Sequence, residues 1–256
     1  MLGAIAGDII GSVYEWSPIK TTDFPLFQPR SRFTDDSVMT VAVGYALLCG
    51  GGYAGAMKRF GRRYPHAGYG GSFRDWLRAD AADPYDSWGN GSAMRVSPVG
   101  WALETEAKVL QAAEGSAEVT HNHPEGIKGA QATALAVFLA RTGAGKDAIR
   151  AAIESRFGYD LQRSLADLRP DYIFDVSCQA TVPAALIAFL DSDSYEAAVR
   201  GAISLGGDAD TLACIAGAIA EAHYRDLPAP IVEEVRRRLP ADLLEVVDDF
   251  TQRYCG

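Results

Sequence analysis

The sequence has little cysteine, and its cysteines are not paired along the chain. The four of them lie far apart and form no CxxC motif: Cys49, Cys178, Cys214 and Cys255. Three lie in apolar segments with helical periodicity or at the ends of such segments. Isolated cysteines of this kind are typical of reduced, buried thiols, so we expect a cytoplasmic protein rather than a disulfide-stabilised secreted one.

A surplus of basic residues is also absent. The chain has 33 acidic and 24 basic residues, which gives a net charge of −9. This charge argues against nonspecific attraction to nucleic acid phosphates or to anionic membranes. We therefore expect a small molecule or a defined protein surface as the partner, with no membrane and no direct nucleic-acid binding.

No apolar run approaches the length of a membrane span. The apolar N-terminal stretch MLGAIAGDIIGSVYE has no Lys or Arg before it and carries Asp8 in its middle, so it resembles a core helix more than a signal peptide. Small residues recur along one side of this predicted helix, and such a stripe lets a second helix approach closely. The stripe consists of Gly3, Gly7 and Gly11.

Strand-like alternation is almost absent, and helical periodicity dominates the chain. A chain of 256 residues that is 48% hydrophobic can bury a large core. We therefore predict an all-α fold, a compact orthogonal helical domain that residues 1–256 form as a single unit. Helices are expected near residues 2–13, 36–49, 54–64, 91–103, 106–118, 124–141, 146–156, 178–190, 195–203, 210–224, 229–238 and 240–253. Long loops at 17–33, 66–90 and 157–177 are expected to be functional and to gather at one end.

Two acidic clusters open apolar helical segments. The first precedes VMTVAVGYALL and the second follows a glycine turn; together they comprise Thr34, Asp35, Asp36, Asp208, Asp210 and Thr211. Helix capping alone remains one explanation of each cluster, because Asp and Thr at a helix start accept hydrogen bonds from free backbone amides.

If the two clusters converge, they require cations. Four neighbouring carboxylates repel one another and lose hydration, at a cost of several kcal/mol. Their carboxylate and hydroxyl oxygens suit Mg²⁺ or Mn²⁺ better than Zn²⁺. This chemistry predicts a binuclear metal cleft, with two ions about 3.5–4 Å apart.

Five motifs resemble, in order, those of the ADP-ribosylglycohydrolases, a family that includes the dinitrogenase reductase-activating glycohydrolase and the ADP-ribosyl-acceptor hydrolases. The motifs are GDIIGSVYE at 7–15, FTDDSVMT at 33–40, GNGSAMRVSP at 89–98, THNHPEGIKGAQA at 120–132 and GGDADTLACIAGAIAEAHY at 206–224. The resemblance implies an all-α fold with two Mg²⁺ or Mn²⁺ ions in a cleft. By motif match it makes the metal ligands Thr34, Asp35, Asp36, Asp208, Asp210 and Thr211.

The resemblance also implies a catalytic carboxylate. Glu15 stands where the family has its catalytic Glu, seven residues after Asp8 and, by periodicity, in the first helix. Without the resemblance, Glu15 reads as an exposed acid at the end of that helix. Asp86, just before the GNG turn, is a second candidate acid.

The remaining motif residues are expected to hold the rest of ADP-ribose. Asn90, Gly91 and Ser92 precede an apolar segment, and backbone amides at such a helix start can face a pyrophosphate. His121 matches a position that contacts the nucleotide in the family. Gly206 and Gly207 would let the backbone approach the ligand beside the metals. An adenine platform is expected from the aromatic side chains of one loop region, namely Phe73, Trp76, Tyr85 and Trp88.

The resulting hypothesis is a metal-dependent hydrolase that cleaves the glycosidic bond at C1″ of ADP-ribose attached to a protein side chain or a small acceptor. The motifs are expected to bind only the ADP-ribose part of the substrate. They therefore do not distinguish between arginine, serine and small O-linked acceptors. Two alternatives also remain. One is a noncatalytic ADP-ribose-binding or crystallin-like protein, and the other is a two-metal nucleotide phosphoesterase.

Overall fold

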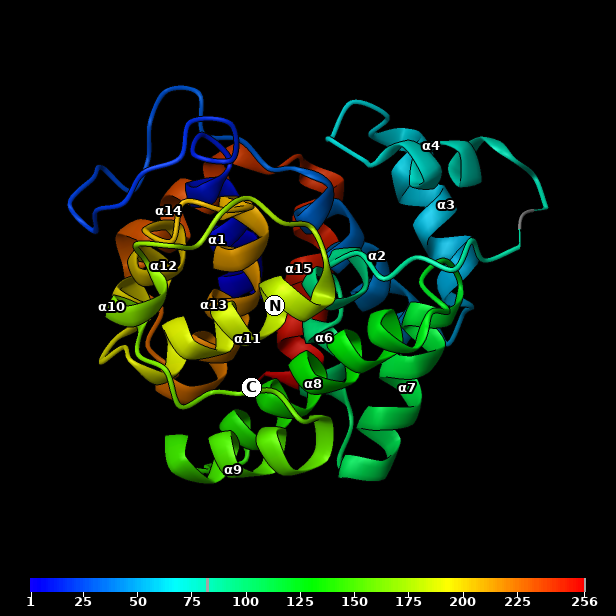
Figure 1. Ribbon diagram of the computed structural model, residues 1–256. Coiled ribbons are helices and arrows are strands. Elements are labelled where there is room, and N and C mark those ends of the chain that lie inside the picture. The colour runs from blue at the N-terminus through cyan, green and yellow to red at the C-terminus, as the bar shows by residue number, and fades with distance from the viewer. Residues whose placement is uncertain (82, 256) are drawn as a thin grey trace.

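The structure is a computed structural model that describes residues 1–81 and 83–255. Helices joined by loops make up this part of the chain, and the only extended pairing in it is an isolated bridge between Gly89 and Ser177 (Figure 1). The prediction of an all-α fold is confirmed. The helices are α1 (Leu2–Gly11), α2 (Asp35–Cys49), α3 (Tyr53–Arg63), α4 (Gly71–Arg78), α5 (Gly91–Met94), α6 (Ser97–Ala102), α7 (Glu106–Glu118), α8 (Pro124–Arg141), α9 (Lys146–Phe157), α10 (Leu165–Leu168), α11 (Cys178–Leu190), α12 (Tyr195–Ile203), α13 (Ala209–Tyr224), α14 (Ala229–Arg238) and α15 (Ala241–Tyr254).

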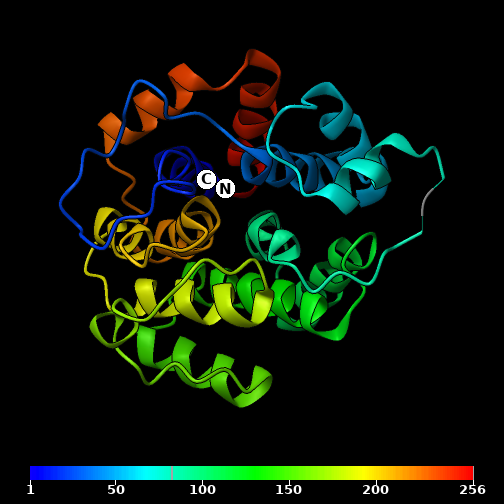
Figure 2. The same cartoon turned by 45° about the horizontal axis from the view of Figure 1, so that its top comes forward.

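Helices α1 and α13 pack against each other at the centre of the molecule (Figures 1 and 2). The predicted glycine stripe brings their backbones into contact. A Cβ atom at Gly7 would lie 2.1 Å from the carbonyl oxygen of Ala213, and one at Gly11 would lie 2.5 Å from the Cα of Asp210. The end of α1 therefore rests on the first turn of α13, where the second acidic cluster lies.

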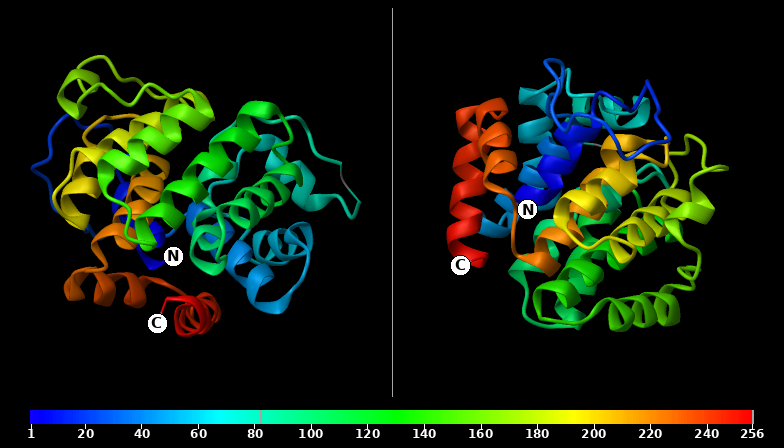
Figure 3. Two further views of the ribbon diagram at one scale, coloured as in Figure 1. Left: turned by 90° about the horizontal axis from the view of Figure 1, so that it is seen from below. Right: turned by 90° about the vertical axis from the view of Figure 1, so that its left-hand side faces the viewer.

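The other helices cover this central pair. Helices α11 and α12 pack on α13, and α8 packs against α7, α9 and α13. Helix α15 lies along α2. Helix α1 begins close to where α15 ends (Figure 3). In the part of the chain that the structure covers, every helix is too short or too polar to cross a membrane. The assignment of residues 1–256 to a single domain stays a prediction.

The helix expected over 91–103 is broken into α5 and α6. Pro98 has no N–H to donate to the carbonyl of Met94, which disfavours a continuous helix across this point. That carbonyl instead accepts hydrogen bonds from the Thr40 hydroxyl and the Cys214 thiol, both at 3.3 Å. The break is stabilised by two residues that are distant in the sequence, which explains why local periodicity did not predict it.

Two short helices lie inside segments that were expected to be loops. Helix α4 lies in 66–90, and it is too short to display a clear period, although Phe73, Trp76 and Leu77 bury one face of it. Helix α10 lies in 157–177 and is held by a capping box.

All four cysteines are free, and Cys49 is exposed at the end of α2. The expectation of buried thiols therefore holds for Cys178 and Cys214 but is wrong for Cys49.

We predict that Gly7→Ala weakens the contact between α1 and α13. The added methyl group would overlap a backbone carbonyl, so the free energy of unfolding should fall by about 3 kcal/mol or more. Gly55→Ala is the matched control, because a Cβ there meets no atom within 4 Å. In a helix this control should be neutral or stabilising by about 0.5 kcal/mol. Urea unfolding of both variants measures the difference, and equal midpoints would contradict the proposed backbone contact.

Candidate active site

Three segments bring carboxylates together beside the start of α13. Carboxylate oxygens of Asp8, Asp36 and Asp210 lie within 4.8 Å of one another, and so do those of Glu15, Asp208 and Asp210. Because both groups share Asp210, they form one continuous cluster. With Asp35, which precedes Asp36, we call it the acidic centre: Asp8, Glu15, Asp35, Asp36, Asp208 and Asp210.

Asp8 was not predicted as a site residue. It is fully buried, and its carboxylate accepts hydrogen bonds from the Thr34 amide at 2.9 Å, the Thr34 hydroxyl at 2.7 Å, the Ser37 amide at 3.1 Å and the Ser37 hydroxyl. Asp8 thereby fastens the start of α2 to α1. The sequence did contain a signal for this role, because a single acid inside an apolar helix has to be paired when the helix is buried. From the sequence alone, Asp8 was used only as an argument against a signal peptide.

One buried oxygen at the start of α2 has no partner. Asp36 Oδ2 accepts weak bonds from the hydroxyls of Thr34 and Thr211, both at 3.4 Å, whereas Asp36 Oδ1 is buried and receives no hydrogen bond. Buried polar atoms are nearly always paired, so an unpaired carboxylate oxygen among other carboxylates fits a cation ligand.

The electrostatics of the acidic centre also fit a cation. Burial raises the pKa of Asp35 to about 8, with a further contribution from the charge of Asp8. Burial and neighbouring carboxylates hold the pKa values of Asp36 and Asp210 well above the usual range. Burial, then the charge of Asp208, raises the pKa of Glu15 to about 7. Without a cation the protein therefore retains protons here near neutral pH, and a divalent ion would replace them.

Glu15 is not in a helix. Helix α1 ends at Gly11, and Glu15 lies four residues later in the turn that follows, half-buried at the edge of the acidic centre. The prediction that it belongs to the first helix is wrong, because the apolar period of the motif continues into the turn. The turn nevertheless places its carboxylate among those of Asp208 and Asp210.

A cavity of about 670 Å³ lies over the acidic centre. Its walls include Glu15, Asp35, Asp36, Asp208, Asp210 and Thr211. Two of the three long loops expected to be functional also contribute, through Gly68, Gly70 to Phe73, Tyr85 to Gly89, Phe174 and Val176. The segment 17–33 does not line the cavity.

The predicted substrate residues divide into two groups. Asn90, Gly91 and His121 line the cavity. Ser92 is buried and donates to the carbonyl of Gly126 at 2.7 Å, so its hydroxyl faces the core. Gly206 and Gly207 lie beside the cavity rather than on its wall. A Cβ at Gly206 would meet Ile19 and Lys20, and one at Gly207 would meet the Tyr172 ring.

Asn90 is buried and makes no side-chain cap on α5, although Asn is a common capping residue at a helix start. Its amide donates to Asp208 Oδ2 at 2.7 Å and to the Thr181 hydroxyl at 3.1 Å. His121 is also buried, and its Nδ1 lies 2.8 Å from the Thr120 hydroxyl. Burial, then the charge of Arg95, holds the pKa of His121 well below its usual range, so the imidazole is neutral.

Aromatic side chains surround the mouth of the cavity. Of the four candidates for an adenine platform, Phe73, Tyr85 and Trp88 line the wall. Trp76 lies in the core with the Lys58 ammonium 4.8 Å from its ring centroid. Sequence patterns did not indicate two further aromatics at the mouth, Trp16 and Phe174. Asp86 also lines the cavity and is exposed, with a positive φ of 53°.

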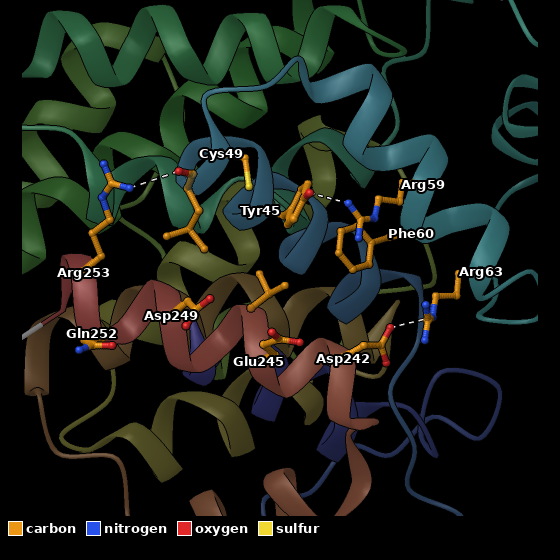
Figure 4. A pocket seen from close by; sticks show the side chains of 12 residues that line it. Tyr45, Cys49, Arg59, Phe60, Arg63, Asp242, Glu245, Asp249, Gln252 and Arg253 are labelled. Carbon is orange, nitrogen blue, oxygen red and sulfur yellow. Dashed lines mark hydrogen bonds and ion pairs between the residues drawn. The ribbon is translucent and has the colours of Figure 1, made fainter.

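A second cavity, of about 650 Å³, lies between α2, α3 and α15 (Figure 4). Its three arginines interact within the protein. Arg63 pairs with Asp242 at 2.8 Å, the Arg59 guanidinium donates to the Tyr45 hydroxyl, and Arg253 donates to the carbonyl of Leu48. None of the residues of the acidic centre lines this cavity. The first cavity is therefore the candidate active site.

Comparisons with known proteins give a consistent result. The family model described as ADP-ribosylglycohydrolase matches residues 1–256. The protein "ADP-ribosylhydrolase ARH3" of Mus musculus is 27% identical over an alignment that covers 88% of this chain and 82% of that protein. "ADP-ribosylarginine hydrolase Tri1" of Pseudomonas putida (strain GB-1) is also 27% identical, covering 92% of this chain and 72% of that protein.

A solved structure shares the fold. It is that of an "ADP-ribosylglycohydrolase-related protein complex", and it superposes with a TM-score of 0.72 at 24% identity. The match covers 98% of this chain and 96% of that one. The all-α arrangement is thus one that an experimentally solved protein also adopts.

We predict that the cation-free protein loses stability as the pH rises from about 5 to about 8. The folded-state pKa values of Asp8, Glu15 and Asp35 are about 6, 7 and 8, above their ordinary values. The native state then binds more protons than the unfolded state, so stability is complete at low pH and is lost through this window. Melting temperatures in excess chelator should fall by several degrees. Asp36→Asn should reduce the slope of melting temperature against pH, because one proton-binding group is removed. A melting temperature that rises toward pH 8 would contradict the prediction.

Proposed function

Because the chain belongs to the ADP-ribosylglycohydrolase family, we propose that it hydrolyses the glycosidic bond at C1″ of ADP-ribose attached to an acceptor, releasing ADP-ribose. The observation that carries the proposal is the acidic centre, which lies in the wall of a cavity of about 670 Å³ with Glu15 at its edge. A family match by itself gives a reaction class, whereas this geometry supplies the groups that the reaction needs.

The oxygen-rich part of the centre is proposed to hold two divalent cations, Mg²⁺ or Mn²⁺. The proposed ligands are those of the two motifs: Thr34, Asp35, Asp36, Asp208, Asp210 and Thr211. The unpaired Asp36 Oδ1 and the raised pKa values of the buried acids support this assignment. When bound, such ions would coordinate the vicinal ribose hydroxyls and so orient C1″.

Glu15 is proposed as the catalytic carboxylate. Its pKa of about 7 lets it accept or give a proton near neutral pH. Glycosidic bonds break through an oxocarbenium-like state, and a carboxylate beside C1″ stabilises the positive charge that develops there. Glu15 then takes a proton from the attacking water, whose oxygen bonds to C1″, and gives that proton to the acceptor atom released when its bond to C1″ breaks. Its half-buried place at the edge of the acidic centre suits this role, because its carboxylate borders the cavity.

The nucleotide end is proposed to lie along the GNG turn, which adjoins the acidic centre through the hydrogen bond of the Asn90 side chain to Asp208. The backbone of Gly89, Asn90 and Gly91 borders the cavity there, and glycines let a phosphate approach closely. The neutral imidazole of His121 can donate or accept one hydrogen bond without adding charge. Ser92, Gly206 and Gly207 would then act by shaping the turns, because they do not border the cavity.

The acceptor is left open by the relatives, since one of them is named an ADP-ribosylarginine hydrolase and others are named ADP-ribosylhydrolases. Product analysis tests the function against its alternatives. Free ADP-ribose supports the proposal, AMP identifies a phosphoesterase, and an unchanged substrate identifies a binding protein. Arginine-linked, serine-linked and small O-linked conjugates should each be offered. A cytoplasmic location stays a prediction.

Replacing Glu15 by Gln should abolish most turnover without disturbing ligand binding. The amide keeps the size of the side chain but cannot take a proton, so kcat should fall about 100-fold or more. Calorimetric titration should show unchanged affinities for Mn²⁺ and for ADP-ribose. Hydrolysis at the unmodified rate would remove Glu15 from the mechanism.

Adding Mg²⁺ or Mn²⁺ should raise the melting temperature, because ligands that bind only the native state stabilise it by about 2.7 kcal/mol at 100 times Kd. Asp210→Asn should lose this gain and the activity, while the cation-free variant remains as stable or becomes more stable. Asp249→Asn, an exposed residue of the second cavity, is the matched control and should behave as the unmodified protein. An active Asp210→Asn enzyme in excess chelator would exclude the metal site.

A further inference from the structure

The exposed large apolar side chains of residues 1–81 and 83–255 are not scattered. All of them lie on the turn after α1, on the segment before α5, or on the segment before α11. They are Trp16, Trp88, Ile173, Phe174 and Val176, with exposed fractions of 78%, 53%, 75%, 42% and 52%. We call these five residues the apolar rim. Contiguous exposed apolar surface of this kind marks interaction sites in soluble proteins.

The apolar rim is continuous with the candidate active site. Four of its residues, Trp16, Trp88, Phe174 and Val176, also line the cavity. The rings of Trp16 and Phe174 stack with centroids 5.4 Å apart and planes 29° apart, which joins two segments that are distant in the sequence. Since Trp16 directly follows Glu15, this stack lies on the side where the bond to the acceptor would break.

Hydrogen bonds hold the rim segments in place. The Lys20 ammonium donates to the carbonyls of Arg169 at 2.8 Å, Tyr172 at 2.5 Å and Leu205 at 2.6 Å. The backbone N–H of Asn90 donates to the Val176 carbonyl at 2.7 Å, and the backbone N–H of Cys178 donates to the Trp88 carbonyl at 2.9 Å. The rim is therefore a fixed surface, and a partner would not have to order it on binding.

The charges around the rim are mainly acidic. Asp171 and Asp175 belong to the same segment as Ile173 and Phe174, and Asp86 lies on the cavity wall near Trp88. The nearby Lys20 is engaged by backbone carbonyls. Arg32 is exposed and is close enough to Glu15 for its charge to lower the Glu15 pKa. A complementary partner would combine apolar with basic side chains.

We propose that the apolar rim binds the acceptor polypeptide of an ADP-ribosylated protein, contacting apolar and basic residues next to the modified side chain. This inference rests on the proposed function and specifies its substrate class. A nucleotide held inside the cavity does not reach Ile173, which is among the most exposed rim residues and is not part of the cavity wall. A small acceptor would likewise leave Ile173 in water, whereas a polypeptide leaving the cavity would cover it.

The test compares two conjugates of the same linkage, chosen as one that the unmodified enzyme cleaves. One is ADP-ribose on a single amino acid, and the other is ADP-ribose on a peptide with apolar and basic residues beside the modified position. The unmodified enzyme should cleave the peptide with at least tenfold higher kcat/KM. Ile173→Ser should reduce this advantage at least threefold and leave the amino-acid conjugate unaffected. Ile173→Val is the control that should keep the advantage.

A third substrate is the same peptide conjugate with its apolar flanking residues replaced by serine. Together with Ile173→Ser it forms a double-mutant cycle between enzyme and substrate. Ile173→Ser should have no further effect on this substrate, because the contact is already absent. Equal kcat/KM for peptide and amino-acid conjugates in the unmodified enzyme would overturn the docking inference. So would an Ile173→Ser enzyme that loses affinity for free ADP-ribose in calorimetry, since the rim would then bind the nucleotide. If no conjugate yields ADP-ribose at all, the proposed function fails first and the docking inference fails with it.

Discussion

The structure depends on keeping several buried carboxylates close together, which is unfavourable unless something offsets their repulsion and lost hydration. The fold offsets this cost in two ways: hydrogen-bond donors surround some of the carboxylates, and others have raised pKa values that keep them protonated without a cation. Asp8 is surrounded by amide and hydroxyl donors from Thr34 and Ser37, and Asp208 receives the Asn90 amide. Asp36 and Asp210 have no comparable supply of donors and hold raised pKa values. Asp8 is thus satisfied by the protein itself, whereas Asp36, Asp208 and Asp210 receive fewer hydrogen bonds and keep oxygens that a cation could bind.

This division assigns different tasks to residues of the same type. Asp8 accepts four hydrogen bonds and joins two helices, so its contribution is architectural. Glu15 is half-buried in a turn and lies against the cavity, so its carboxylate can exchange protons with a ligand. Environment rather than residue identity separates these roles, as it does wherever neighbouring carboxylates carry different pKa values.

Periodicity and composition were sufficient to predict an all-α fold and most helices, because each depends on residues close in the sequence. The two acidic clusters could be recognised for the same reason. What local patterns could not supply were contacts across the chain. The break at Pro98 is stabilised by Thr40 and Cys214, the burial of Asn90 depends on Asp208, and the role of Asp8 requires α2 to begin beside α1. The stack of Trp16 on Phe174 likewise joins segments more than a hundred residues apart.

The close approach of α1 to α13 bears on how sequence variants should be interpreted. A single methyl group at Gly11 would press on the Cα of Asp210, although Gly11 has no functional group and borders no cavity. Such a change would strain the packing of α1 on α13 and at the same time displace a carboxylate of the acidic centre. A glycine variant at this helix end would therefore reduce both stability and chemistry, although the residue itself carries no functional group.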